Sequence, residues 1–191
     1  MKNCSLCSGA KNFYYGFEGK RYSDKKVMLI LNHPDERVNT SKDYRNVLAD
    51  TPTGKVLREM LYYSGLEFED VYITNSVKCV FPDRTPKKEE YSNCKLILKK
   101  QIGELKPNSI LLFGEKPYKK LFSENRKKNL ADVIGNEMEF NGVPCLINLH
   151  PSKIWALIGK DRKAVHYRRV RKFLDKYDSL GNFHEQKEIN F

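Results

Sequence analysis

The chain has 191 residues, 40% hydrophobic and 12% aromatic, which suffices for a buried core and excludes a wholly disordered protein. Its net charge of +11 predicts an anionic partner, with nucleic acid favoured over a membrane surface. No run approaches a membrane-spanning length, and the N-terminus lacks the apolar core of a secretion signal. The Lys-rich composition and compact size suit a bacterial or phage protein. We expect a monomer that does not bind membranes and is associated with the nucleoid, in the cytoplasm of a bacterium or a phage-infected cell.

Short apolar runs predict four buried strands, and helical patterns lie between and after them. The strands are expected at Val27–Leu31, Val71–Thr74, Ile110–Phe113 and Cys145–Leu149. Helices are expected from Thr51-Pro52, from Thr85-Pro86, near Lys116–Phe122 and from about Asp161 to Tyr177, and a hairpin is expected around Asn141-Gly142. This alternation predicts an α/β fold, a three-layer α/β/α sandwich with a central parallel sheet of about four strands. We expect residues 1–191 to form a single domain, with a loose tail after about residue 180.

Four of the five cysteines occur in two pairs, Cys4-x-x-Cys7 near the N-terminus and Cys79 with Cys94 in mid-chain. Without a secretion signal, we expect a reducing compartment, which argues against disulfide bonds and favours metal ligation. Four thiolates suit either a structural zinc ion or an iron–sulfur cluster, and spacing alone does not separate the two. Cys145 lies within an expected strand, so we assign it to the core.

Polar residues follow each expected strand at once. They are Asn32-His33-Pro34-Asp35, Asn75, Gly114 and His150-Pro151-Ser152. An Asn that ends a strand is often only a turn residue, and a His before Pro is often only a structural one. In open α/β sheets, however, ligands bind beyond the carboxyl ends of the strands. The matching positions therefore predict one shared site.

Several of these motifs together resemble the uracil-DNA glycosylase superfamily, and most of all its iron–sulfur branch, family 4. The resemblance rests on Tyr72-Ile73-Thr74-Asn75-Ser76-Val77-Lys78-Cys79, the following Pro82…Arg84-Thr85-Pro86, Cys94 and His150-Pro151-Ser152, and it spans roughly Cys4 to Ser152. It implies that Cys4, Cys7, Cys79 and Cys94 hold a [4Fe–4S] cluster, with a structural zinc ion as the alternative.

The resemblance also implies a DNA glycosylase that hydrolyses the N-glycosidic bond of uracil, or of a related deaminated or modified base, after the base has left the DNA stack. Asn75 would then read the base, because its amide offers a donor and an acceptor. His150 would stabilise negative charge on O2 of the departing base.

The segment after His150 would contact DNA. Ser152 and Lys153 would hold phosphates, and Arg162 and Lys163 of the basic last helix would add to this surface. Trp155, together with Ile154 and Leu157, would form an apolar wedge that enters the gap left by the flipped base. Alternatively, Trp155 packs on the last helix.

The first motif departs from the family pattern, which is of the Gly-Glu-x-Pro-Gly type and helps to position the attacking water. Asn32 occupies the Glu position, where it could orient water, and His33 follows as a possible base. Leu31 and Asp35 replace the glycines. Tyr44 is the nearest candidate to stack on the flipped base.

Two alternatives to the glycosylase stay open. The first is a catalytically inert iron–sulfur protein that keeps the fold and binds nucleic acid. The second is an enzyme that uses the same site on free nucleotides.

Overall fold

A six-stranded mixed sheet lies at the centre of the protein, in the order β2-β4-β3-β6-β8-β7. The computed structural model describes residues 4–35, 48, 50–82, 84–122, 129–157 and 160–177. The four inner strands are parallel, namely β4 (Val71–Asn75), β3 (Val27–Leu31), β6 (Ser109–Phe113) and β8 (Val143–Asn148). The edge strands, β2 (Phe17–Glu18) and β7 (Glu137–Phe140), run antiparallel to their neighbours.

The α/β class is thus confirmed, whereas the prediction of a purely parallel sheet of about four strands is corrected. The inner strands are buried on both faces and appear in the sequence as continuous apolar runs. β2 has only two residues, and β7 alternates exposed and buried ones. Such half-exposed edge strands carry no apolar run that the sequence analysis could detect.

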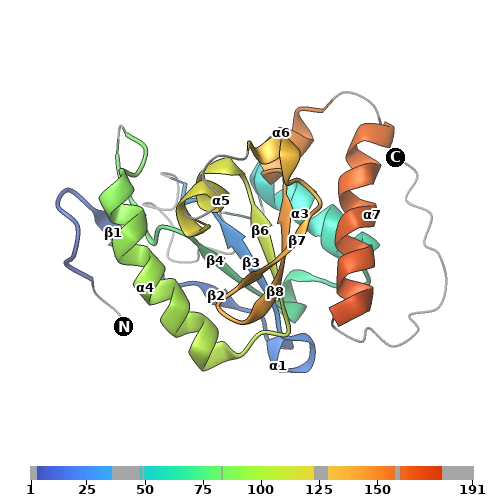
Figure 1. The fold of residues 1–191 in the computed structure, drawn as a ribbon, viewed down its shortest axis with the longest axis horizontal. Helices are drawn as coiled ribbons and strands as arrows, with labels where there is room; N and C mark the ends of the chain where they lie inside the picture. The colour runs from blue at the N-terminus through green and yellow to red at the C-terminus, as the bar shows by residue number, and fades with distance from the viewer. Residues whose placement is uncertain are drawn as a thin grey trace.

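Helices pack against both faces of the sheet (Figure 1). One face is covered by α3 (Pro52–Tyr63) and α7 (Lys160–Tyr177), and the other by α4 (Lys88–Leu105) and α5 (Glu115–Leu121). Because successive side chains of a strand point to opposite faces, Leu29 joins the first core and Met28 the second. The short helices are α1 (Tyr22–Lys25), η2 (Phe68–Asp70), η4 (Leu130–Asp132) and α6 (Pro151–Trp155).

Local capping explains where the main helices begin. Thr51 caps α3 as predicted, since its Oγ1 accepts a hydrogen bond from the Gly54 N–H at 3.0 Å. The second helix, α4, begins two residues later than Pro86. The Glu90 carboxylate accepts from the Lys87 N–H and pairs with Arg84 at 2.6 Å, so Lys87 becomes the N-cap.

A small second sheet joins the N-terminal segment to the middle of the chain. β1 (Lys11–Phe13) pairs antiparallel with β5 (Cys79–Val80), and Phe13 lies opposite Cys79. The Tyr14 N–H extends this pairing by donating to the Lys78 carbonyl at 2.8 Å. This sheet brings the N-terminal cysteine pair toward Cys79, and strands this short left no periodic signal in the sequence.

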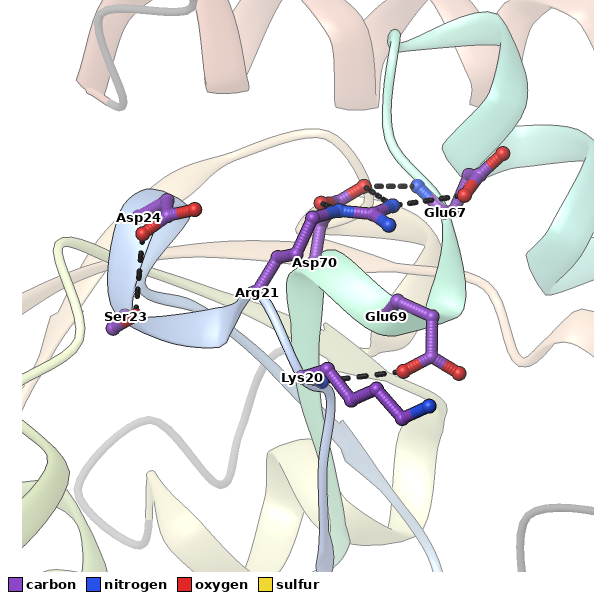
Figure 2. Close-up of polar contacts among 7 residues, drawn as sticks. All are labelled: Lys20, Arg21, Ser23, Asp24, Glu67, Glu69 and Asp70. Carbon is purple, nitrogen blue, oxygen red and sulfur yellow. Dashed lines mark hydrogen bonds and ion pairs between the residues drawn. The ribbon is translucent and has the colours of Figure 1, made fainter.

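An ion-pair network joins Arg21, the residue before α1, to η2 at the amino end of β4 (Figure 2). Arg21 donates from Nε to Asp70 at 2.7 Å and from Nη2 to Glu67 at 2.8 Å. The Asp70 carboxylate also accepts from the Glu67 N–H at 2.7 Å, which caps η2 directly before β4. No helix within the described ranges is long and apolar enough to cross a membrane.

Candidate active site and metal centre

The ends of β3 and β4 place two of the predicted residues next to each other. Leu31 and Asn75 are paired in the sheet register, so Asn32 follows directly beside Asn75. The Ser76 N–H donates to the Leu31 carbonyl at 2.8 Å, and the Val77 N–H donates to the Asn32 carbonyl at 3.0 Å. The backbone around both asparagines is therefore held in a defined position, and Asn75 is only 1% exposed.

His150 begins α6 and caps it with its own side chain. Its Nδ1 accepts from the Ser152 N–H at 3.3 Å and lies 2.8 Å from the Ser152 Oγ. A nitrogen that accepts a backbone N–H carries no proton, so this network assigns the proton of the neutral ring to Nε2. His150 therefore presents a hydrogen-bond donor at Nε2.

The surroundings of His150 keep the ring uncharged. Burial, followed by the charges of His33 and Lys153, lowers the pKa of His150 to about 4. Gly114 at the end of β6 permits this position, because a Cβ there would lie 3.3 Å from the Cβ of His150. The φ of +100° at Gly114 also disfavours any side chain.

His33 has the opposite hydrogen-bonding polarity. Its Nδ1 lies 3.0 Å from the Pro34 carbonyl, which can only accept, so Nδ1 is the donor. When the His33 ring is uncharged, its Nε2 therefore carries a lone pair. Because His33 acts on the pKa of His150, the two rings are electrostatic neighbours. The site thus combines one imidazole donor with one imidazole acceptor.

Two further residues that the sequence analysis missed hold the strand end that carries His150. The Asn148 Oδ1 accepts from the Leu149 N–H at 2.8 Å and bonds the His166 Nδ1 at 2.7 Å. Asn148 ends β8 and His166 comes from α7, and both are buried. Burial, with a smaller effect of Arg169, lowers the pKa of His166 to about 4.

The cysteine pairs meet beside the strand end of β4. Cys79 and Cys94 are buried in one cluster, and Cys7 packs against it. Burial, and to a lesser extent the thiols of Cys94, Cys4 and Cys7, raises the pKa of Cys79 to about 12. Two N–H groups point at sulfur: Asn93 Nδ2 donates to Cys7 at 3.5 Å, and the Lys78 N–H donates to Cys94 at 3.4 Å.

The chemistry of these four residues fits a thiolate-bound metal group. All four are free of disulfide bonds. Burial raises the pKa of Cys79 and of Cys94, so these two thiols would stay protonated at neutral pH without a metal to displace the proton. As they stand, no three Cys, His, Asp or Glu side chains of the described ranges form a site for a single metal ion. Cys145 is 0% exposed in the second core, which confirms its assignment.

The residues predicted to contact DNA have different surroundings. Ser152 and Lys153 are exposed beside His150, and Arg162 is exposed near the start of α7. Trp155 is 44% exposed, and the Nζ atoms of Lys55 and Lys163 lie 6.0 and 5.5 Å from its ring centroid.

Ile154 is 0% exposed, so the prediction that it belongs to a wedge is wrong. It packs in the first core because α6 turns this side chain toward the sheet. Leu157 is half-buried. Tyr44, predicted to stack on the base, and the predicted loose tail after residue 180 lie outside the described residues.

A cavity of about 570 Å³ lies elsewhere, against β7. It is lined by Tyr118, Val133, Gly135, Asn136, Glu137, Met138 and Lys176. None of these is a predicted site residue, so the site follows from the strand ends and not from this cavity.

Comparison with known proteins gives a consistent family. The sequence profile of the uracil DNA glycosylase superfamily matches residues 18–174. The Type-4 uracil-DNA glycosylase of Thermotoga maritima is 30% identical over 155 residues, which cover 80% of this chain and 78% of the relative. The Type-4 uracil-DNA glycosylase of Pyrobaculum aerophilum is 34% identical over 138 residues, or 71% and 68% of the two chains. A Type-5 uracil-DNA glycosylase of the same organism is 29% identical over 90 residues, or 47% of this chain and 40% of the relative. The chain described above belongs to the uracil-DNA glycosylase superfamily.

Proposed function

We propose that this protein is a monofunctional uracil-DNA glycosylase. It hydrolyses the N-glycosidic bond of uracil, or of a related deaminated base flipped out of DNA, and leaves an abasic site. The observation that carries this proposal is the neutral His150, whose Nδ1 is occupied by the Ser152 N–H and whose Nε2 is therefore a donor. Family membership supports the same reaction.

His150 supplies the main stabilisation of the transition state. As the bond to the sugar lengthens, its electron pair moves to the base and negative charge grows on O2. A fixed N–H donor at this oxygen stabilises the charge more in the transition state than in the bound substrate. Because the pKa of His150 is lowered to about 4, the ring acts as a hydrogen-bond donor and not as an acid at neutral pH.

Asn75 recognises the base. Its side-chain amide has one donor and one acceptor group, which match the adjacent carbonyl and N–H of a uracil edge. The backbone carbonyl of Asn75 accepts from the Lys78 Nζ at 2.7 Å, and the same Nζ donates to the Thr74 Oγ1 at 2.6 Å. Lys78 is 0% exposed, so this contact holds the strand end from within the protein.

His33, which follows the residue at the family's Glu position, receives the attacking water. The water oxygen bonds to the anomeric carbon, the glycosidic electron pair leaves with the base, and His33 Nε2 accepts the proton. The Pro34 carbonyl at 3.0 Å orients the ring for this role by holding Nδ1–H. A strong base is unnecessary, because an oxocarbenium-like sugar is already a reactive electrophile.

Cys4, Cys7, Cys79 and Cys94 would hold a [4Fe–4S] cluster, and a structural zinc ion is the competing occupant. N-glycosidic hydrolysis is redox-neutral, so the bound group supplies a structural link and no electrons. It would fix the N-terminal pair against α4 and the segment after Asn75. Metal analysis of the purified protein distinguishes iron from zinc.

DNA is the proposed partner of a monomeric, single-domain enzyme acting in the cytoplasm. Ser152, Lys153, Arg162 and Lys163 would contact its phosphates, and the exposed Trp155 would contact the bases beside the flipped nucleotide. A net charge of +11 supports an electrostatic contribution to this binding that weakens with salt.

The test measures release of free uracil from single- and double-stranded oligonucleotides, with thymine at the same position as the control. Iron content and visible absorption are recorded on the same sample. Release of uracil with retention of thymine is the expected result. Salt-dependent DNA binding that is unchanged in Asn75→Ala, with no release of any deaminated base, would favour the inert DNA-binding protein instead.

A further inference from the structure

Asn32 is held by a buried tyrosine of α4. The Tyr91 hydroxyl lies 2.6 Å from the Asn32 Oδ1. Tyr91 comes from α4, is 2% exposed, and belongs to the same buried cluster as Cys79 and Cys94. The helix that carries one of the cysteines therefore also contacts the first motif.

The polarity of this contact follows from the groups involved. The Asn32 Oδ1 can only accept, so the phenol donates. The backbone carbonyl of Asn32 is fixed as well, since it accepts from the Ser76 Oγ at 2.7 Å and from the Val77 N–H at 3.0 Å. With its backbone and its Oδ1 both held, Asn32 turns Nδ2, the donor branch of its amide, away from Tyr91.

We infer that Tyr91 is a positioning residue that makes Asn32 a hydrogen-bond donor toward the substrate, so that His33 alone serves the attacking water. This inference rests on the proposed function and deepens it. The substrate group that meets Asn32 is an acceptor oxygen, such as a carbonyl of the flipped pyrimidine. It replaces the expectation that Asn32 orients the attacking water.

Asn32→Asp separates the two roles. An aspartate keeps the acceptor that Tyr91 needs and places a second carboxylate oxygen where Nδ2 stood. A donor role predicts that this variant loses activity, because an anion then faces the acceptor oxygen of the substrate. A water-orienting role predicts equal or higher activity, since a carboxylate accepts a water proton better than an amide.

The experiment measures kcat and KM for uracil release by the parent, Tyr91→Phe, Asn32→Ala, Asn32→Asp and the double variant Tyr91→Phe/Asn32→Ala. Removing the phenol should lower kcat about tenfold with little change in KM, which corresponds to the loss of one hydrogen bond. In the Asn32→Ala background, the same change should have no further effect. The kcat of Asn32→Asp should be lower than that of the parent.

Tyr22→Phe is the matched control, because it removes another buried phenol, whose hydroxyl bonds the Leu105 carbonyl near the amino ends of the strands. Iron content must be equal in all variants. The inference is overturned, and the proposed function stands, if the kcat of Asn32→Asp equals or exceeds that of the parent. The same holds if Tyr91→Phe lowers kcat by the same factor in the Asn32→Ala background as in the parent. If the parent releases no uracil, the proposed function fails and the inference fails with it.

Discussion

The two ends of the parallel strands carry polar side chains that are used in different ways. At the amino end of β4, Arg21 and Asp70 form an ion pair with each other and hydrogen bonds with neighbouring groups (Figure 2). At the carboxyl ends, Asn32, His33 and His150 are amides and imidazoles, and each is bound through one of its two polar atoms. Within the part of the chain that the structure describes, the second atom of each group bonds no protein atom, so it is available to a ligand.

The hydrogen-bonding pattern of a polar residue therefore distinguishes a stabilising role from a role in the reaction better than its residue type does. An ion pair whose polar atoms all bond each other or neighbouring groups stabilises the local turn, but it leaves few polar atoms that could bind a substrate. An amide or imidazole bound through one atom is oriented by the protein and keeps a second atom of known polarity. Substitutions at the carboxyl end should therefore change the reaction, and substitutions at the amino end should change only stability.

The largest effect is expected at His150. Replacement by Ala removes the Nε2 donor and should lower kcat for uracil release by about 10²–10³-fold, as for the loss of one oxyanion donor. Circular dichroism and iron content should match the parent. Asp70→Asn serves as the control at the amino end and should release uracil at the parental rate. A loss of less than threefold in His150→Ala would contradict the role assigned to this ring.

Asn75→Ala should have the next largest effect, because it removes both hydrogen bonds to the base edge. A lost bidentate base contact costs about 1–3 kcal/mol, so kcat/KM for uracil should fall by about tenfold to a hundredfold. Affinity for DNA without uracil should not change, since phosphate contacts are intact. Equal losses of affinity for both DNAs would instead indicate that Asn75 supports the fold.

The sequence predicted the carboxyl end well in one respect, namely which residues follow the strands. Apolar runs such as Val27–Leu31 and the polar residues behind them are local signals, and parallel strands bring their ends together by topology. The edge strand β2 was not predicted, since it has only two residues, whereas the hairpin of β7 with β8 was expected from its Asn141-Gly142 turn.

The contacts that orient those residues could not be predicted. Tyr91 reaches Asn32 across 59 positions, and His166 reaches Asn148 across 18. In the sequence, both partners lie on helices and look like ordinary core residues. Their hydrogen bonds depend on how helix and sheet pack, which no short-range pattern contains. The proposed role of the first motif therefore rests on contacts that only the structure shows.

The two buried histidines should make the stability of the fold depend on pH, and this effect should be smaller than those of the two substitutions above. The pKa values of His150 and His166 are lowered from 6.5 to about 4 in the folded chain. The unfolded chain then takes up protons that the folded chain refuses, so stability falls as the pH drops from 6.5 toward 4. His166→Gln removes one of these groups and should reduce the loss at about pH 5 by about 1–2 kcal/mol in urea unfolding. An unchanged pH dependence would mean that His166 is protonated in the fold.

The smallest effect is expected for a substitution at the amino end of β4. Asp70→Ala removes the carboxylate that accepts from the Glu67 N–H at 2.7 Å and pairs with Arg21. Loss of this cap should lower the free energy of unfolding by about 1 kcal/mol. Uracil release per folded molecule should not change, because β4 separates Asp70 from Asn75. A fall in kcat without a fall in stability would show that the two ends of the strand are coupled, and the division between them would then be wrong.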